Sequence, residues 1–234
     1  MAASSTGRVL VRESSRARRL TIKVAPQAPL EVVVPVGTGE REIERLLRRH
    51  RDWIARKTAE AERLAARPAL GLDRAGVAWL HGEALPIELR GGVRSAARLD
   101  RGRLAVSGPA AQVPAAIERW YRREARLRLT EVTRREARRL ELRPRRLSIR
   151  DQRTRWGSCS PDGALSFSWR LLLAPREILD YVVVHELCHL RELNHSPAFW
   201  RLLDAARPGW RAEAGWLRDH GWEIGAYRPR LALT

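Results

Sequence analysis

The sequence predicts an α+β protein in which short strands come first and helices dominate the second half. Apolar residues alternate at period two between residues 8 and 35, which is typical of strands with one buried face. Over residues 114–142, and again after Pro175, they recur at the three-to-four-residue spacing of helices. We therefore expect two regions, residues 8–110 with strands and one long helix, and residues 111–225 with the functional site.

The first region begins with two or three strands of a small antiparallel sheet. The alternating apolar residues are Val9, Val11, Leu20, Ile22, Val24, Leu30, Val32 and Val34. Thr38 is a favoured N-cap residue, and an apolar helical stripe continues to about Arg67, where Pro68 would end the helix. Short alternations over residues 77–106, interrupted by glycines, then predict hairpins.

The second region starts with a long amphipathic helix over residues 114–142. A strand is expected at residues 147–149, followed by a hairpin over residues 153–169 with its turn at residues 160–163. The hairpin leads directly into a helix that Pro175 is well placed to begin.

That helix carries His185-Glu186-Leu187-Cys188-His189, with apolar residues on nearly every side. Helical residues four apart lie about 40° apart around the axis and about 6 Å along it, so His185 and His189 can point at one site. Glu186 lies about 100° round from His185, close enough to reach a water bound there. Zinc hydrolases use this arrangement: the metal lowers the pKa of its water toward about 7, and the carboxylate accepts the proton.

The alternative is a buried histidine pair that is satisfied by hydrogen bonds rather than by a metal. Burying an unpaired polar group costs roughly 2 to 7 kcal/mol, so two histidines and a glutamate on an apolar helix need compensation. A chance H-E-x-x-H is expected in roughly 1 in 100 sequences of this length and composition, which favours the metal site. Cys188 is a further candidate ligand, although a small core residue suits its position better.

A third metal ligand has to come from beyond this helix. If the helix continued, His195 would lie about 9 Å past His189 and could not share a metal with it. Because Pro197 cannot continue the same helix, we expect the helix to end near Leu193. Asn194 would then be a left-handed cap that turns His195 back over the site.

Two alternatives to His195 as a ligand stay open. Ser196 and Pro197 match the N-cap and first residue of a new helix, so His195 could be an exposed residue ahead of that helix. The competing third ligand is an acid from a later helix, either Glu213 or Asp204.

Several short motifs follow one another within about residues 145–222. They are Arg155-Trp-Gly-Ser-Cys159, Leu171-Leu-Leu-Ala-Pro175, the stretch Asp180–Leu190 around the two histidines, Asn194-His-Ser196 and Phe199-Trp200. In this order they resemble the YgjP-like metallopeptidase family, which is related to SprT-like zinc peptidases.

The resemblance implies a zincin-like catalytic domain, in which a buried H-E-x-x-H helix lies next to a β-hairpin. It further implies Zn²⁺ held by His185, His189 and His195, with Glu186 as the general base and a peptide or unfolded protein as the substrate. Ser168 departs from the Asn that is common there among relatives, a difference that concerns substrate contacts and not the metal site.

The hairpin supplies candidate substrate-binding residues. A strand beside the metal of a zinc peptidase often pairs with the substrate backbone, and Arg155 and Trp156 begin this hairpin. A packing tryptophan and a surface arginine are the alternative. His220 and Tyr227 are candidates for stabilising an oxyanion, although the sequence does not place them.

The net charge of +18 points to an anionic second partner, a nucleic acid or a nucleotide. Of the 45 basic residues, all except Lys23 and Lys57 are arginines, which bind phosphate in a bidentate way. Many alternate with glutamates on helix faces, which favours an ordinary solvated surface. Two rival functions follow: a metal-dependent nucleotide phosphohydrolase using arginines such as Arg155 and Arg170, and a DNA-associated protein with a structural metal.

The sequence gives no sign of a membrane segment or of disulfides. It has no run of about 18 apolar residues, and its start lacks the apolar stretch of a secretory signal. The two cysteines, Cys159 and Cys188, do not form a disulfide framework. We therefore expect a cytoplasmic protein.

Overall fold

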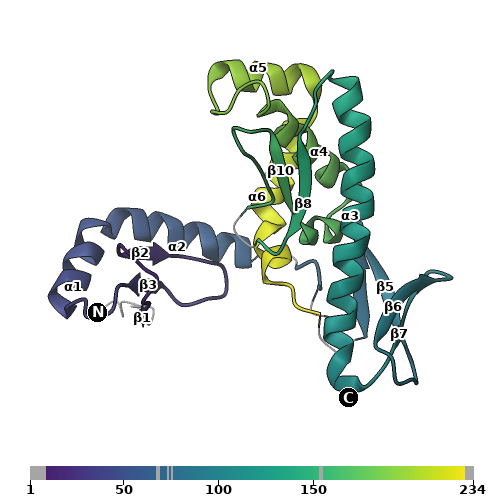
Figure 1. The fold of residues 1–234 in the computed structure, drawn as a ribbon. Helices are drawn as coiled ribbons and strands as arrows, with labels where there is room; N and C mark the ends of the chain where they lie inside the picture. The colour runs from purple at the N-terminus through teal and green to yellow at the C-terminus, as the bar shows by residue number, and fades with distance from the viewer. Residues whose placement is uncertain (1–8, 67–68, 73, 75, 153–154, 230–234) are drawn as a thin grey trace. The chain divides into compact units, whose positions relative to one another are not determined.

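The computed structural model describes residues 9–66, 69–72, 74, 76–152 and 155–229 (Figure 1). It divides into two compact units, Met1–Ala69 and Leu70–Thr234. This division falls earlier in the chain than residue 110, because the strands between residues 77 and 107 pack against a long helix of the second unit. The predicted helix end at Arg67 and Pro68, and residues 153–154 of the predicted hairpin, lie outside the described residues.

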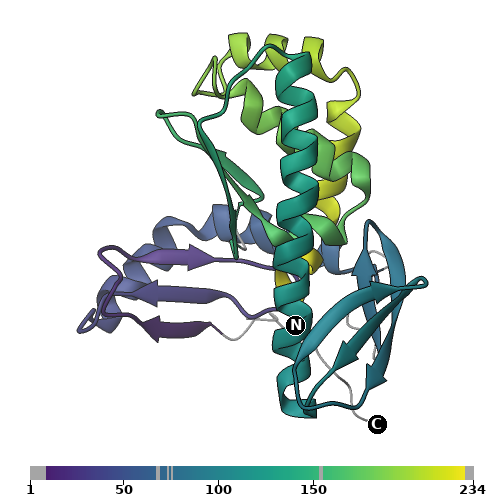
Figure 2. The same cartoon turned by 45° about the vertical axis from the view of Figure 1, so that its right-hand side comes forward.

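The first unit contains a three-stranded sheet with the order β1-β3-β2 (Figure 2). Its strands are β1 (Leu10–Glu13), β2 (Thr21–Lys23) and β3 (Glu31–Val34). The prediction of an antiparallel sheet is wrong for one pair, because β1 runs parallel to β3 while β2 runs antiparallel to it. Period-two alternation shows which residues share a face but not which strand is central, and here the buried β3 takes the centre.

Two helices follow where the sequence predicts one. They are α1 (Glu40–Arg49) and α2 (Arg51–Ala65), separated at His50, whose φ of −106° and ψ of 15° depart from helical values. Thr38 is not the N-cap: its hydroxyl donates to the Pro35 carbonyl, and Gly39 takes the cap position. The apolar spacing continues across His50, so the pattern does not reveal the break.

The second unit opens with a four-stranded sheet in the order β4-β5-β7-β6. The strands are β4 (Val77–Leu80), β5 (Glu83–Arg90), β6 (Ala96–Asp100) and β7 (Arg103–Ser107), which confirms the predicted hairpins. The turn between β4 and β5 donates two backbone hydrogen bonds, from His81 to Leu172 and from Gly82 to Leu173, just ahead of the helix that carries the two histidines.

The long predicted helix is confirmed as α3 (Val113–Arg139), after the short 3-10 helix η1 (Ala110–Gln112). A second sheet follows, with β8 (Arg146–Arg150), β9 (Gly157–Cys159) and β10 (Ala164–Ser168). Its order is β8-β10-β9, so β9 forms the predicted hairpin with β10 and is an edge strand of this sheet. Buried residues of α3 such as Ile117, Tyr121 and Leu129 belong to the core shared with this sheet and the later helices.

The chain then enters the helical part of the unit. A 3-10 helix that the sequence does not predict, η2 (Trp169–Leu173), separates the hairpin from α4 (Arg176–Cys188), and α5 (Pro197–Ala206) and α6 (Trp210–Ala226) complete the unit. In the core, α4 contacts α3, α5, α6 and β9. Every helix among the described residues is too short or too polar to cross a membrane.

Candidate metal centre

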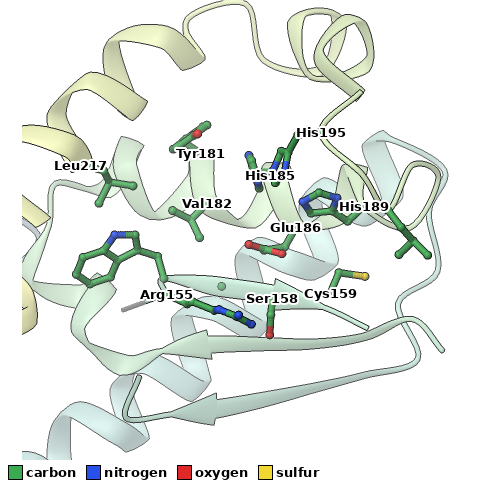
Figure 3. A pocket seen from close by; sticks show the side chains of 13 residues that line it. Arg155, Ser158, Cys159, Tyr181, Val182, His185, Glu186, His189, His195 and Leu217 are labelled. Atoms are coloured by element: carbon green, nitrogen blue, oxygen red, sulfur yellow. Dashed lines mark hydrogen bonds between the residues drawn. The ribbon is translucent and has the colours of Figure 1, made fainter. Parts of the chain in front are cut away.

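Helix α4 is buried almost all round, and this fixes the direction of its polar side chains. Val183, Val184 and Leu187 are 0% exposed. Pro175 occupies the N-cap position, so the predicted start of the helix is confirmed within a residue. Because the apolar residues pack in the core, His185 faces a pocket on one side of the helix (Figure 3).

The helix ends earlier than the sequence predicts. Its last residue is Cys188 and His189 is the C-cap, whereas an end near Leu193 was expected. Asn194 is not left-handed, since its φ is not positive. Hydrogen bonds of the 3-10 type end the helix instead, such as the one from Leu190 N–H to the Leu187 carbonyl at 3.0 Å. The chain therefore begins to turn back at the second histidine, His189.

The reversal brings three histidines together. One ring nitrogen from each of His185, His189 and His195 lies within 4.8 Å of the others, and the Nε2 atoms of His185 and His195 are 3.0 Å apart (Figure 3). Tetrahedral zinc with bonds of 2.0–2.1 Å to nitrogen would separate its ligands by about 3.3 Å. The three side chains therefore fit a zinc ion with small adjustments.

Two of the rings are oriented by their surroundings. His189 Nδ1 lies 2.9 Å from the Glu192 carbonyl, so Nδ1–H donates there and leaves Nε2 as a metal-ligating lone pair. The ring of His195 stacks on Trp200, at 5.4 Å between centroids and 29° between planes. Ser196 accepts a hydrogen bond from Phe199 N–H, which confirms it as the N-cap of α5 and fixes the backbone next to His195.

His185 is kept neutral by its position. Burial, with His189 and His195 nearby, lowers the pKa of His185 to about 3. The neutral imidazole is the form that binds metals. Its buried Nδ1 has no hydrogen-bond partner among the described residues.

Glu186 lies between α4 and the edge strand β9. It is 6% exposed, and burial raises its pKa to about 7, with Arg155 acting in the opposite direction. A Cβ on Gly157 would lie 2.5 Å from the Glu186 Cγ, so glycine is what lets the β9 backbone approach this side chain. The carboxylate is thereby confined beside the histidines.

The centre opens into a pocket of about 390 Å³. The residues predicted to bind substrate, Arg155 and Trp156, are among those that line it. The other lining residues are Gly157, Ser158, Cys159, Tyr181, Val182, His185, Glu186, His189, Leu193, His195 and Leu217. Tyr181, Val182 and Leu217 are pocket residues that the sequence motifs do not single out. Tyr181 and Val182 precede His185 by four and three residues, a spacing that could have revealed them; Leu217, on α6, has no such signal.

The competing ligands lie elsewhere. Glu213 accepts two hydrogen bonds from Arg207, and Asp204 pairs with Arg211 and accepts from Trp210 Nε1. Cys188 is 1% exposed in the core, where burial raises the pKa of its thiol to about 11. None of these joins the metal-binding group formed by the described residues.

Three further predicted contributors do not line the pocket. Tyr227 is buried beside Tyr121, with 3.4 Å between their hydroxyl oxygens, and His220 lies 3.3 Å from Glu223. Arg170 is 1% exposed and pairs with Asp151, so it cannot attract a ligand as the phosphohydrolase alternative assumed.

Three convergent imidazoles beside a buried glutamate, in an open pocket of an α+β unit, define a candidate metal-dependent hydrolase. Residues 18–220 match the family model described as YgjP-like, metallopeptidase domain, and the chain belongs to this family. The protein therefore belongs to the class of metal-dependent peptidases.

Other comparisons add little to this assignment. The crystal structure of the metallopeptidase zymogen of Pyrococcus abyssi abylysin is similar at 24% identity, over 37% of this chain and 86% of that chain, with a TM-score of 0.33. A likeness of that size does not bear on the fold or the site. No curated protein matches the chain.

Proposed function

We propose that the protein is a zinc metallopeptidase in which His185, His189 and His195 hold the metal and Glu186 is the general base. The observation that supports this most is the convergence of three ring nitrogens within 4.8 Å beside a buried carboxylate, at an open pocket. A structural zinc site would have a fourth protein ligand, whereas three ligands leave a position for water and substrate.

Glu186 carries out the proton transfers of this proposal. Zinc, when bound, polarises the substrate carbonyl and makes its water more acidic. Glu186 accepts the proton of the attacking water and passes it to the leaving amine. The contact with Gly157 limits the motion of the Glu186 carboxylate. The carboxylate therefore stays within reach of both the attacking water and the leaving amine.

The edge strand β9 suggests how a peptide would lie in the site. Gly157, Ser158 and Cys159 line the pocket, and among the described residues β9 is paired on one side alone, with β10. An extended peptide can add to such an edge through backbone hydrogen bonds, with the cleaved bond beside Glu186. This mode requires an extended segment, so the proposed substrates are peptides and unfolded proteins.

The pocket suits a peptide better than a nucleoside triphosphate. Among the described residues that line it, Arg155 is the one arginine or lysine. Several cationic groups are needed to neutralise a triphosphate, and Glu186 would repel it. DNA binding by the arginine-rich surface stays a prediction; many of these arginines pair with neighbouring carboxylates, as Arg122 does with Glu118.

The test is hydrolysis by the purified, zinc-loaded protein of an unfolded protein such as reduced, alkylated casein, beside nucleoside triphosphates. We expect peptide cleavage that a chelator stops and added zinc restores, with no phosphate or pyrophosphate release. Phosphate release without peptide cleavage would replace the peptidase with the phosphohydrolase. Tight, steeply salt-dependent DNA binding without any hydrolysis would favour a structural metal.

A further inference from the structure

The pocket has two ends of different chemistry. His189, His195, Glu186 and Cys159 form one end, whereas Tyr181, Val182 and Leu217 lie on the other side of His185 (Figure 3). Trp156 also lines the pocket. Its indole packs on Gly221 of α6, the helix that carries Leu217. Trp156, Tyr181, Val182 and Leu217 therefore give this part of the pocket apolar and aromatic surfaces.

We propose that Trp156, Tyr181, Val182 and Leu217 form a subsite for one large apolar side chain of the substrate, next to the bond that is cleaved. The inference rests on the proposed peptidase function and names the substrate class, peptides with a residue such as Phe or Leu flanking that bond. Water displaced from these walls by an apolar side chain would favour binding.

The walls are held in place before any substrate arrives. A Cβ on Gly221 would lie 3.0 Å from Cζ2 of Trp156, so the indole packs directly on the backbone of α6. The Trp156 carbonyl also accepts a hydrogen bond from Ser168 N–H at 2.9 Å. The ring of Tyr181 stacks on Trp210, with 12° between their planes. A preformed apolar wall loses little side-chain freedom on binding, which favours selectivity.

The position of the subsite determines which substrate residue enters it. Tyr181 and Val182 precede His185 and Glu186 by four residues each, which is about one helical turn, or about 6 Å along the axis. A side chain between these walls therefore belongs to a residue adjacent to the carbonyl under attack. Residues farther along the peptide would extend past the pocket along β9.

The same walls disfavour charged side chains. Val182 and Leu217 have no polar side-chain atom, so an ionic group placed against them would lose water without gaining a partner. Burial raises the pKa of Tyr181 to about 12, so its hydroxyl is uncharged at neutral pH. Among the described residues that line the pocket, Arg155 is the one whose side chain would attract an acidic group.

The test compares wild-type protein with Leu217→Trp and Leu217→Ala on a peptide library that varies one residue on each side of the cleaved bond. We expect wild-type cleavage to be enriched for Phe and Leu at one of these positions. Leu217→Trp should lower kcat/KM for the Phe peptide about tenfold relative to the Ala peptide, because it fills the subsite, and Leu217→Ala should shift the preference toward larger residues. Leu127→Trp, on the exposed face of α3 outside the pocket, is the matched control.

Binding without turnover gives a second readout. In a Glu186→Gln background, calorimetry should show that Leu217→Trp weakens binding of the Phe peptide about tenfold relative to its effect on the Ala peptide. Cleavage with no apolar enrichment, or with a preference that Leu217→Trp leaves unaltered, would overturn the subsite but not the peptidase. Absence of all peptide cleavage by zinc-loaded wild-type protein would overturn the proposed function and the subsite together.

Discussion

A methyl group on Gly157 would lie 2.5 Å from Cγ and 2.7 Å from Oε1 of Glu186, so the backbone of the edge strand is in direct contact with the proposed general base. The φ of Gly157 is not positive, so alanine is compatible with the backbone there and the contact alone decides the effect.

Gly157→Ala should therefore displace the carboxylate while leaving the three histidines in place. A shift of about 1 Å at a catalytic group can cost on the order of 10²-fold in rate, and we expect a loss of that size with metal content unchanged. Gly209→Ala is the matched control, because a Cβ there has no heavy atom within 4 Å. Wild-type kcat in Gly157→Ala would contradict the account of this contact.

Glu186→Gln keeps the shape of the side chain but removes its ability to accept a proton. We expect the variant to bind zinc with a stoichiometry like that of the wild type and to lose on the order of 10² to 10⁴ in kcat. Glu131→Gln, on the exposed part of α3, serves as the control for a changed carboxylate. Full peptidase activity in Glu186→Gln would remove the general-base assignment.

Local patterns predict much of the second unit, because its elements depend on near neighbours. The hairpins, α3 and the N-cap at Ser196 follow from alternation, helical spacing and cap chemistry. The spacing of His185 and His189 predicts convergent rings, and the structure places the ring nitrogens together. The approach of His195 is expected too, but for a partly mistaken reason, since the turn begins at His189 rather than at Asn194.

Features that depend on long-range contacts are the ones the sequence does not supply. Whether β1 pairs in parallel with β3 depends on which strand takes the centre of the sheet, which alternation does not show. The break between α1 and α2 at His50 does not interrupt the apolar spacing, so the pattern does not reveal it. Leu217 reaches the pocket only because α6 packs on α4, and η2 is fixed by hydrogen bonds from the distant turn at His81.

The stacking of Trp200 on His195 should strengthen metal binding. His195 is exposed and follows the end of α4, and its ring is held by the stack on Trp200 and by an edge contact with Phe199 at 4.7 Å. Trp200 in turn stacks on Trp210 at 4.9 Å. We expect Trp200→Ala to weaken zinc affinity about 10- to 100-fold, as loss of an orienting partner does, and Trp200→Phe to restore part of it. Competition with a chromophoric chelator measures this affinity.

Trp216→Ala, which removes the ring beside His220 instead, is the control for loss of a tryptophan from the helical part of the unit. Equal zinc affinities in Trp200→Ala and the wild type would show that the stack does not orient His195.

Glu136 should make the stability of the second unit pH-dependent. It is 6% exposed on α3 and accepts hydrogen bonds from Arg135 and Arg139, and Arg135 also pairs with Asp180 of α4. Burial raises the pKa of Glu136, but the hydrogen bonds and positive charges of Arg135 and Arg139 together outweigh it and hold that pKa below its ordinary value of 4.5. Its stabilisation is therefore fully present above the unfolded-state pKa and lost as the pH falls through the native value.

We expect Glu136→Gln to lower the free energy of unfolding by about 2 kcal/mol at neutral pH. The difference from the wild type should shrink as the solution is acidified through the native pKa, as measured by urea denaturation across the pH range. Glu131→Gln, at an exposed pair, should change little. A difference that stays constant with pH would mean that Glu136 is not charged in the folded protein.

The most direct measurement of the central claim is the zinc content of purified wild-type protein, His185→Ala and His195→Ala after equal zinc loading and dialysis. Three ligands on one ion predict one zinc per wild-type chain and its loss in both variants, with circular dichroism confirming that the variants are folded. Retention of tightly bound zinc by folded His195→Ala would contradict the three-histidine centre.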